Sequence, residues 1–437
     1  METEAVETEL RSRVRALLHA NGVTGYSSFL GAHYNYIAPS KERYQFQWFW
    51  DTCFHVFIQC ALGEIDSAKE NLRSLFRMQD DDGFVGHMIF WNQTLPHSLA
   101  DIVHAKLNMQ TIRPHMSALI QPPLVAQALK RIYAKTGDKL FLLEMLPKII
   151  AYHEWLARNR DFDGDGLISI ISPSESGVDW KPSFDEAVGS NVRTKAKYLL
   201  ASKLFWRVAS REISNFLNGY SLLPHQRRFA VKEVTVNTAY ACDLRMLSQL
   251  CLTAGLRDDA IRYIRRAEQV GRSMQEFLYD HESSAFYDAL SGSNKKLKVL
   301  TAMSFLPIVL PETPQEVCKR MVQKHLNNPE EFLSTYPVPS VAMNDPAYYP
   351  KESSALWRGP TWPVMNWFLF NALRVRGFTE ESHRLRESLS QLIAKSGFRE
   401  YYNPQTGEGY GAQGFTWPGL ILDMEEEGER AAKVAAR

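Results

Sequence analysis

Apolar side chains recur along most of the chain at the spacing of helices that bury one face. In eight segments they stand at i, i+3, i+4 and i+7, which predicts amphipathic helices. The eight segments are 64–78, 115–136, 138–158, 191–217, 235–254, 256–279, 361–376 and 379–396. The acidic and then amphipathic start of the chain predicts a further helix over about 1–22.

The expected helices come in pairs joined by short turns, as at Gly255 between 235–254 and 256–279. Strand-like alternation is sparse, and short strands would fit best in 281–300 or 333–352. The repeat is too irregular for a solenoid, and no Ser/Gly-rich or Pro-rich linker marks a domain boundary. The pattern therefore predicts one all-α domain over 1–437, a closed ring of helical hairpins.

The balance of charges limits the classes of molecule that the protein can attract. Lys and Arg total 50 against 49 Asp and Glu, so the net charge of +1 gives no field that attracts nucleic acid or an anionic membrane. A small-molecule partner is expected, and a homo-oligomer is compatible with this composition.

The five cysteines are scattered without a C-x-x-C pair, the start is unlike a secretory signal, and no run of 18 apolar residues occurs. We therefore expect a cytoplasmic protein with reduced thiols and no membrane span.

Aromatic residues make up 12% of the chain and gather in five clusters that also carry carboxylates or amides. Aromatic faces stack on the C–H face of a pyranose, while Asp, Arg and Gln bind its hydroxyls. Any single cluster is also compatible with ordinary core packing. The clusters are YQFQWFWD (44–51), HMIFWN (87–92), ESGVDWKPSFD (175–185), ALWRGPTWPVMNW (355–367) and EYYNPQTGEGYGAQGFTW (400–417).

Two carboxyl groups in these clusters suit acid and base roles. Asp179 precedes Trp180, and desolvation against an indole would keep a carboxyl protonated, as a general acid requires. Glu400 precedes two tyrosines that could orient it or a water. Cleavage of a glycosidic bond needs such a pair, although either acid alone could be a helix cap or a surface ion-pair partner. The glycine-rich segment 407–411 is a candidate lid over the sugar.

Signals for metals and other cofactors are weak. DFDGDG at 161–166 resembles the start of a calcium loop, but Ser172 stands where the bidentate Glu belongs, which favours a turn between helices. Histidines 87, 97, 104 and 115 lack the spacing of a helical zinc pair and are interpreted as structural. With no phosphate-binding loop in evidence, we expect neither metal nor cofactor.

The motifs QWFWDTCFH, QPP at 121–123, ESGVDWKPSFD, WRGPTWPVMNW and EYYNPQTGEG occur in an order that resembles glycoside hydrolase family 63. The resemblance spans about 40–420 and implies an (α/α)6 barrel, a fold shared at clan level with family 37 trehalases. It implies that Asp179 is the acid and Glu400 the base of an inverting hydrolase. The resemblance also implies that the sugar is bound by Trp50, Asp51, Gln121, Trp357, Arg358 and Trp362. It further assigns Tyr44 and Arg228 to the site. To these the aromatic clusters add Trp48 and Trp180.

A compact chain of this kind looks most like the family members that hydrolyse glycosylglycerates. The expected reaction is therefore inverting hydrolysis of 2-O-α-mannosyl- or 2-O-α-glucosyl-D-glycerate, a small anionic compatible solute, to sugar and glycerate. Arg228 or Arg358 would then face the substrate carboxylate. Three alternatives stay open: an α-glucosidase on neutral disaccharides, an epimerase or isomerase that uses histidine, and a catalytically silent sugar-binding protein.

Overall fold

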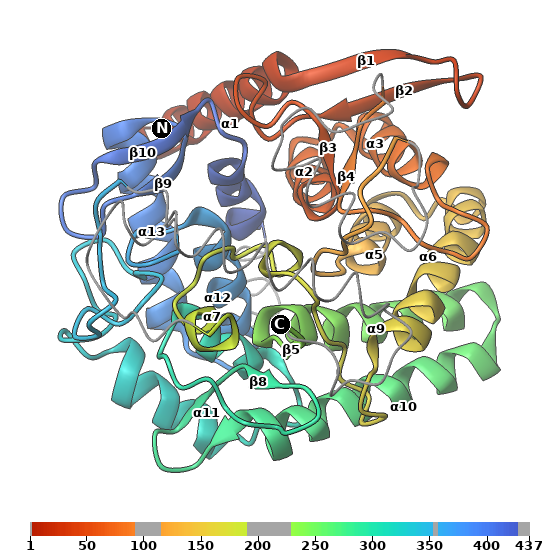
Figure 1. The fold of residues 1–437 in the computed structure, drawn as a ribbon. Coiled ribbons are helices and arrows are strands. Elements are labelled where there is room, and N and C mark those ends of the chain that lie inside the picture. The colour runs from red at the N-terminus through yellow and green to blue at the C-terminus, as the bar shows by residue number, and fades with distance from the viewer. Residues whose placement is uncertain (1, 92–114, 190–228, 353–356, 427–437) are drawn as a thin grey trace, which may run out of the picture.

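The computed structural model describes residues 2–91, 115–189, 229–352 and 357–426, with the side chains described from residue 8 onward. Its helices form a ring around a central axis (Figure 1). The inner ring runs from α2 through α5, α9, the 3-10 helix η4 and α12 to η6, which contacts α2 again and closes the circle. Outer helices α3, α6, α10 and α13 each pack on the inner helix that precedes them in the chain. The predicted (α/α)6 barrel is confirmed.

The bounds of the helices follow the apolar periodicity closely in most places. The α-helices are α1 Glu2–Asn21, α2 Phe49–Leu62, α3 Ile65–Arg77, α5 Val125–Thr136, α6 Lys139–Arg160, α7 Phe184–Ala187, α9 Val234–Ala254, α10 Arg257–Ser273, α11 Gln315–Met321, α12 Pro363–Val375 and α13 Thr379–Ser396. The 3-10 helices are η1 Pro173–Glu175, η4 Ala302–Val309 and η6 Trp417–Leu420, and π-helical turns are η3 Met274–Leu278 and η5 Val322–Leu326.

One predicted helix is too long, and another cannot be compared. Helix α5 begins at Val125 rather than at 115, because Pro122 and Pro123 lack the N–H groups a helix interior needs and force the preceding residues into extended conformations. This places Gln121 in an extended segment ahead of the helix. The predicted helix over 191–217 falls outside the described residues.

The strands are short and form two-stranded antiparallel sheets. The 281–300 region contains parts of two such pairs, whereas 333–352 makes only isolated bridges. The longest hairpin, β1–β2, was not predicted, and it lies at the edge of the ring beside α3. The strands are β1 Gly22–Ser27, β2 Ala32–Ile37, β3 Gln47–Trp48, β4 Met88–Ile89, β5 Val231–Lys232, β6 Tyr279–Asp280, β7 Ala285–Phe286, β8 Ala289–Leu290, β9 Arg399–Tyr402 and β10 Gly409–Gln413.

Three inner helices, α2, α12 and η6, begin at one mouth of the barrel. Trp50 and Asp51 lie in the first turn of α2, Trp362 is the N-cap of α12, and Trp417 opens η6. Helix amino termini carry partial positive charge, so this mouth favours carboxylates. All five cysteines are free. Within the described ranges, no helix is long and apolar enough to cross a membrane.

Candidate active site

A pocket of about 220 Å³ opens at this mouth and collects residues from far-apart parts of the chain. That volume lies below the ~300–1,000 Å³ common for drug-sized ligands, which points to a small ligand. Its described lining consists of Pro39, Tyr44, Trp48, Trp50, Asp51, His87, Met88, Phe90, Ser117, Leu119, Gln121, Ser174, Gly177, Asp179, Trp180, Trp357, Trp362, Glu400, Phe415 and Trp417. The lining is thus rich in indole rings and carries three carboxyl groups.

Glu400 is held rigidly in this wall by strand pairing. It lies on β9, and its Oε2 accepts a hydrogen bond of 2.9 Å from the backbone N–H of Ala412 on β10. Its Oε1 accepts one of 2.8 Å from the hydroxyl of Tyr44. Burial raises the pKa of Glu400 above its usual value, and these donors, with Arg43 at 3.8 Å, offset part of that rise. A carboxyl with a raised pKa that is still oriented for proton transfer suits a general base.

Gly411 shows that the glycine-rich segment packs directly against Glu400. Its φ is +68°, and a Cβ there would lie 2.5 Å from Oε2 of Glu400. The segment 409–413 is a strand paired with β9, so the expectation of a lid over 407–411 is replaced by that of a fixed support.

Asp179 reaches the same pocket from the loop between η1 and α7. It is half-buried, as is its neighbour Trp180, whose φ of +63° is unusual for a residue with a side chain. Gly177 in the same loop packs against Trp50, and a Cβ at Gly177 would lie 2.5 Å from that ring. Asp179 and Glu400 both act on the Tyr44 hydroxyl: burial first, and then their negative charges, raise its pKa. The two carboxyls thus share one pocket.

Asp51 is the third carboxyl of the pocket. It is buried, and its Oδ1 accepts a hydrogen bond of 2.7 Å from the indole N–H of Trp417. Burial raises its pKa from 3.8 to about 7, although the Trp417 bond lowers it. Helix α2 begins at Phe49 with Trp48 as its N-cap, so Asp51 is inside the first turn and does not cap the helix.

Stacked indole rings lie beside these polar groups in the pocket. The rings of Trp357 and Trp362 stack at 3.8 Å with 12° between their planes, and Trp362 stacks in turn on Tyr401 at 4.5 Å. Trp50 meets Trp417 edge to face at 5.5 Å. Such rigid aromatic surfaces complement the apolar face of a pyranose.

Of the twelve residues predicted for the site, ten line this pocket. Gln121 lies there with its Oε1 accepting a hydrogen bond of 3.1 Å from the backbone N–H of Trp50, which fixes the amide. Arg358 is different: its guanidinium is buried and bonded to both oxygens of Asp185, so it is not in the pocket wall. Arg228 lies outside the described residues. The ten are Tyr44, Trp48, Trp50, Asp51, Gln121, Asp179, Trp180, Trp357, Trp362 and Glu400.

The structure adds pocket residues that the sequence did not single out. His87, interpreted as structural, lines the pocket with its Nδ1 bonded to Ser117 Oγ and its ring edge-on to Trp48. Phe415 and Trp417 also line it. All three residues belong to the aromatic clusters, because His87 opens HMIFWN and Phe415 and Trp417 close the last motif. None of the three, however, is next to a predicted catalytic acid.

The DFDGDG segment and His55, which stands in the QWFWDTCFH motif, both make contacts within the fold. Asp163 and Asp165 of the DFDGDG segment pair with Lys232, and Asp161 accepts a hydrogen bond from the Gly166 N–H, so a turn follows α6 there. Across the described ranges no cluster of three or more His, Cys, Asp or Glu residues could hold a metal. His55 is fully buried, bonded to Thr416 at 2.7 Å, and burial lowers its pKa to about 3.

Comparisons with known proteins agree on one family. A family model described as the mannosylglycerate hydrolase MGH1-like glycoside hydrolase domain matches residues 44–418. A mannosylglycerate hydrolase of Rubrobacter radiotolerans is 28% identical over 420 residues, which cover 90% of this chain and 93% of the relative. A glucosylglycerate hydrolase of Mycolicibacterium hassiacum is 25% identical, over 95% of this chain and 97% of the relative. The crystal structure of a family 63 mannosylglycerate hydrolase from Thermus thermophilus, in complex with Tris and D-glycerate, has a TM-score of 0.79 at 25% identity and covers 95% of this chain and 100% of that one.

Proposed function

The chain belongs to the mannosylglycerate hydrolase MGH1-like family of glycoside hydrolases, and on that premise we propose that it hydrolyses 2-O-α-mannosyl- or 2-O-α-glucosyl-D-glycerate with inversion. The observation that carries the proposal is the meeting of Asp179 and Glu400, 221 residues apart in sequence, in one small indole-lined pocket. The mannosylglycerate and glucosylglycerate hydrolases similar to this chain match it over nearly their full lengths.

The two carboxyls divide the chemistry. Asp179 protonates the glycosidic oxygen as the bond to the sugar breaks, and Glu400 takes a proton from the water that attacks the anomeric carbon from the opposite face. Tyr44 and the Ala412 amide fix the orientation of Glu400. The indoles of Trp357 and Trp362 support the sugar ring, and Asp51 and Gln121 bind its hydroxyls.

The glycerate carboxylate needs a cationic partner, because an unpaired carboxylate in a desolvated pocket is costly. Arg358 is excluded from that role by its bonds to Asp185. We keep Arg228 as the proposed partner, from the family resemblance. His87 and Ser117 also lie on the pocket wall, where they are bonded to each other.

The test compares substrates that differ only in the group under question. Sugar release from glycosylglycerate is measured beside release from the matching glycosylglycerol, whose aglycone is neutral, using wild type and Arg228→Gln. The proposal expects a much higher kcat/KM for the glycerate compound in wild type and a much smaller preference in the variant. Equal activity of wild type on both substrates would overturn the glycerate assignment.

A neutral disaccharide is the second candidate substrate. The observation that favours it is that the described lining contains neither Lys nor Arg. Release of glucose from glucobioses at rates above those for glycosylglycerates would establish this alternative. For the compartment we propose the cytoplasm, supported by five free thiols, four of them buried.

A further inference from the structure

The Asp179 loop and the short helices η1 and α7 on either side of it carry three buried charged residues, which form four ion pairs with the barrel. Glu175, Lys181 and Asp185 stand four residues before, two after and six after Asp179, and each is at most 3% exposed. Glu175 is bonded to Arg160 at the end of α6, and Asp185 to Arg358 ahead of α12.

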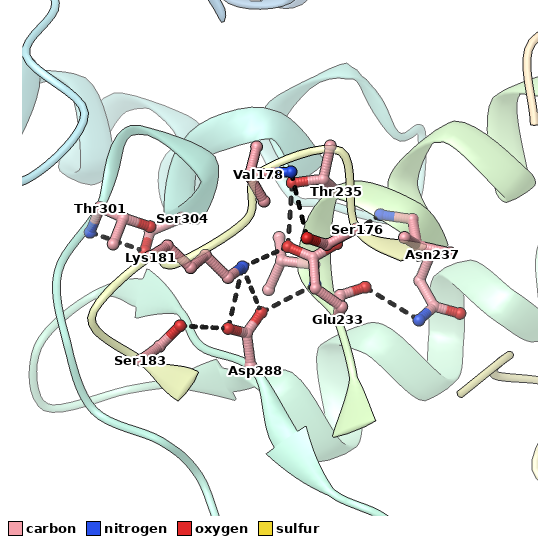
Figure 2. A network of polar contacts seen from close by, with 12 residues as sticks. Ser176, Val178, Lys181, Ser183, Glu233, Thr235, Asn237, Asp288, Thr301 and Ser304 are labelled. Atoms are coloured by element: carbon pink, nitrogen blue, oxygen red, sulfur yellow. Dashed lines mark hydrogen bonds and ion pairs between the residues drawn. The ribbon is translucent and has the colours of Figure 1, made fainter. Parts of the chain in front are cut away.

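Lys181 makes the most elaborate of these attachments (Figure 2). Its ammonium group is bonded to Glu233 and lies 2.9–3.0 Å from the two carboxylate oxygens of Asp288. Ser183, on the same loop, donates a hydrogen bond of 2.7 Å to Asp288. The loop is thus attached to Asp288 at two points and to Glu233 at a third.

The two acids of this cluster are themselves fixed by the start of α9. Glu233 is the N-cap of α9 and accepts a hydrogen bond of 2.6 Å from the N–H of Val236, while Asp288 accepts one of 3.0 Å from the N–H of Val234. The N–H groups at the start of α9 and the ammonium group of Lys181 therefore share these two carboxylates, although burial still raises the pKa of Glu233. Burial lowers the pKa of Lys181, but the two carboxylates raise it by more, so the lysine stays charged.

The residue between Asp179 and Lys181 has an unfavourable backbone conformation, which the ion pairs of Lys181 help to maintain. Trp180, between Asp179 and Lys181, has a φ of +63°, which residues with side chains rarely adopt without support from their surroundings. Buried ion pairs contribute little net stability, because desolvation offsets their attraction, and fixing one geometry is a better-attested use. Acid catalysis is sensitive to that geometry, since a displacement of about 1 Å can cost ~100-fold in rate.

We infer that Lys181, with Glu233 and Asp288, is a positioning cluster that holds Asp179 at the distance from the glycosidic oxygen that protonation requires. This inference rests on the proposed function, in which Asp179 is the acid. It predicts that loss of Lys181 slows reactions that need protonation and spares those that do not.

The chain offers a closely matched control in Lys232. Lys232 is also buried and also pairs with two carboxylates, Asp163 and Asp165, but these belong to the turn after α6 and not to the Asp179 loop. Lys181→Met and Lys232→Met therefore remove the same group from similar surroundings. Each is assayed on glycosylglycerate, whose leaving group needs an acid, and on the α-glycosyl fluoride, whose fluoride leaves with little protonation.

For Lys181→Met we expect kcat on glycosylglycerate to fall at least ~10-fold, with KM and the fluoride rate within about 3-fold of wild type. For Lys232→Met we expect both rates within about 3-fold of wild type, whatever its thermal midpoint. If Lys181→Met does not fold, Asp288→Asn replaces it, and a smaller loss with the same selectivity is expected. A uniform loss on both substrates, or a Lys181→Met profile equal to that of Lys232→Met, would overturn the inference.

Asp179→Asn, run in parallel, separates this inference from the proposed function. If Asp179→Asn keeps its turnover on glycosylglycerate, the acid assignment fails and the positioning role fails with it. If Asp179→Asn loses that turnover but keeps the fluoride reaction, while Lys181→Met behaves like Lys232→Met, only the positioning role fails.

Discussion

Replacing Asp51 with Asn is expected to stabilise the protein at pH 8 while lowering its activity. Burial raises the pKa of Asp51 to about 7 in the folded state from an ordinary value of 3.8. Between these two pH values the unfolded chain releases the proton and the folded chain retains it, so the stability contributed by Asp51 falls as the pH rises from about 4 to about 7. Asn keeps an oxygen for the Trp417 indole and never ionises, so it avoids this loss.

The size of the effect follows from the same values. The difference between 3.8 and about 7 corresponds to up to about 4 kcal/mol between wild type and variant at pH 8, and to almost none at pH 4. With an unfolding entropy of about 2.1 cal/mol/K per residue, a chain of 437 residues gains about 4 °C in thermal midpoint from that amount.

Thermal midpoints of wild type and Asp51→Asn measured from pH 4 to pH 8 test this reasoning. Asp185→Asn is the control, because Asp185 is equally buried at 3% exposure but is bonded to Arg358. That variant should lose stability at pH 8, since breaking a buried ion pair costs about 3–5 kcal/mol. A midpoint for Asp51→Asn that stays at or below that of wild type across the whole range would refute the argument.

Three further outcomes follow from the site. Tyr44→Phe removes the 2.8 Å hydrogen bond that lowers the pKa of Glu400, so the acidic limb of the kcat profile should move to higher pH; an unmoved limb would contradict Glu400 as the base. Gly177→Ala should cost at least ~10-fold in activity, because the new Cβ meets Trp50 at 2.5 Å; near-normal turnover would show that the loop can yield. Treatment with EDTA should leave activity and thermal midpoint unchanged, and restoration of either by calcium would identify a site at 161–166.

The helices could be predicted from sequence where one face is apolar over several turns, as in α3, α10 and α13. The prediction failed ahead of α5, where apolar residues continue the period but two prolines prevent a helix. It also missed the β1–β2 hairpin, whose residues alternate without a strong turn signal. Periodicity reports which residues favour burial, and backbone hydrogen bonding then decides the conformation.

The site was predicted as far as aromatic and acidic residues gather within single motifs. Lys181 shows the limit, because its partners Glu233 and Asp288 are 52 and 107 residues away and nothing in the local sequence connects them. Arg358 shows the converse: the motif around it suggested a ligand contact, and the fold supplies Asp185 as its partner. Such pairs form only when the tertiary fold brings distant segments together, and no local sequence pattern specifies that arrangement.

In the proposed mechanism Glu400 activates water and Asp179 protonates the leaving oxygen, with inversion at the anomeric carbon. Proton NMR of the first turnovers on 2-O-α-glycosyl-D-glycerate tests it most directly, because the anomeric signal is read before mutarotation. We expect free glycerate to appear together with sugar in the β configuration, and Glu400→Gln to release neither at a significant rate. An initial α-configured sugar would contradict the mechanism.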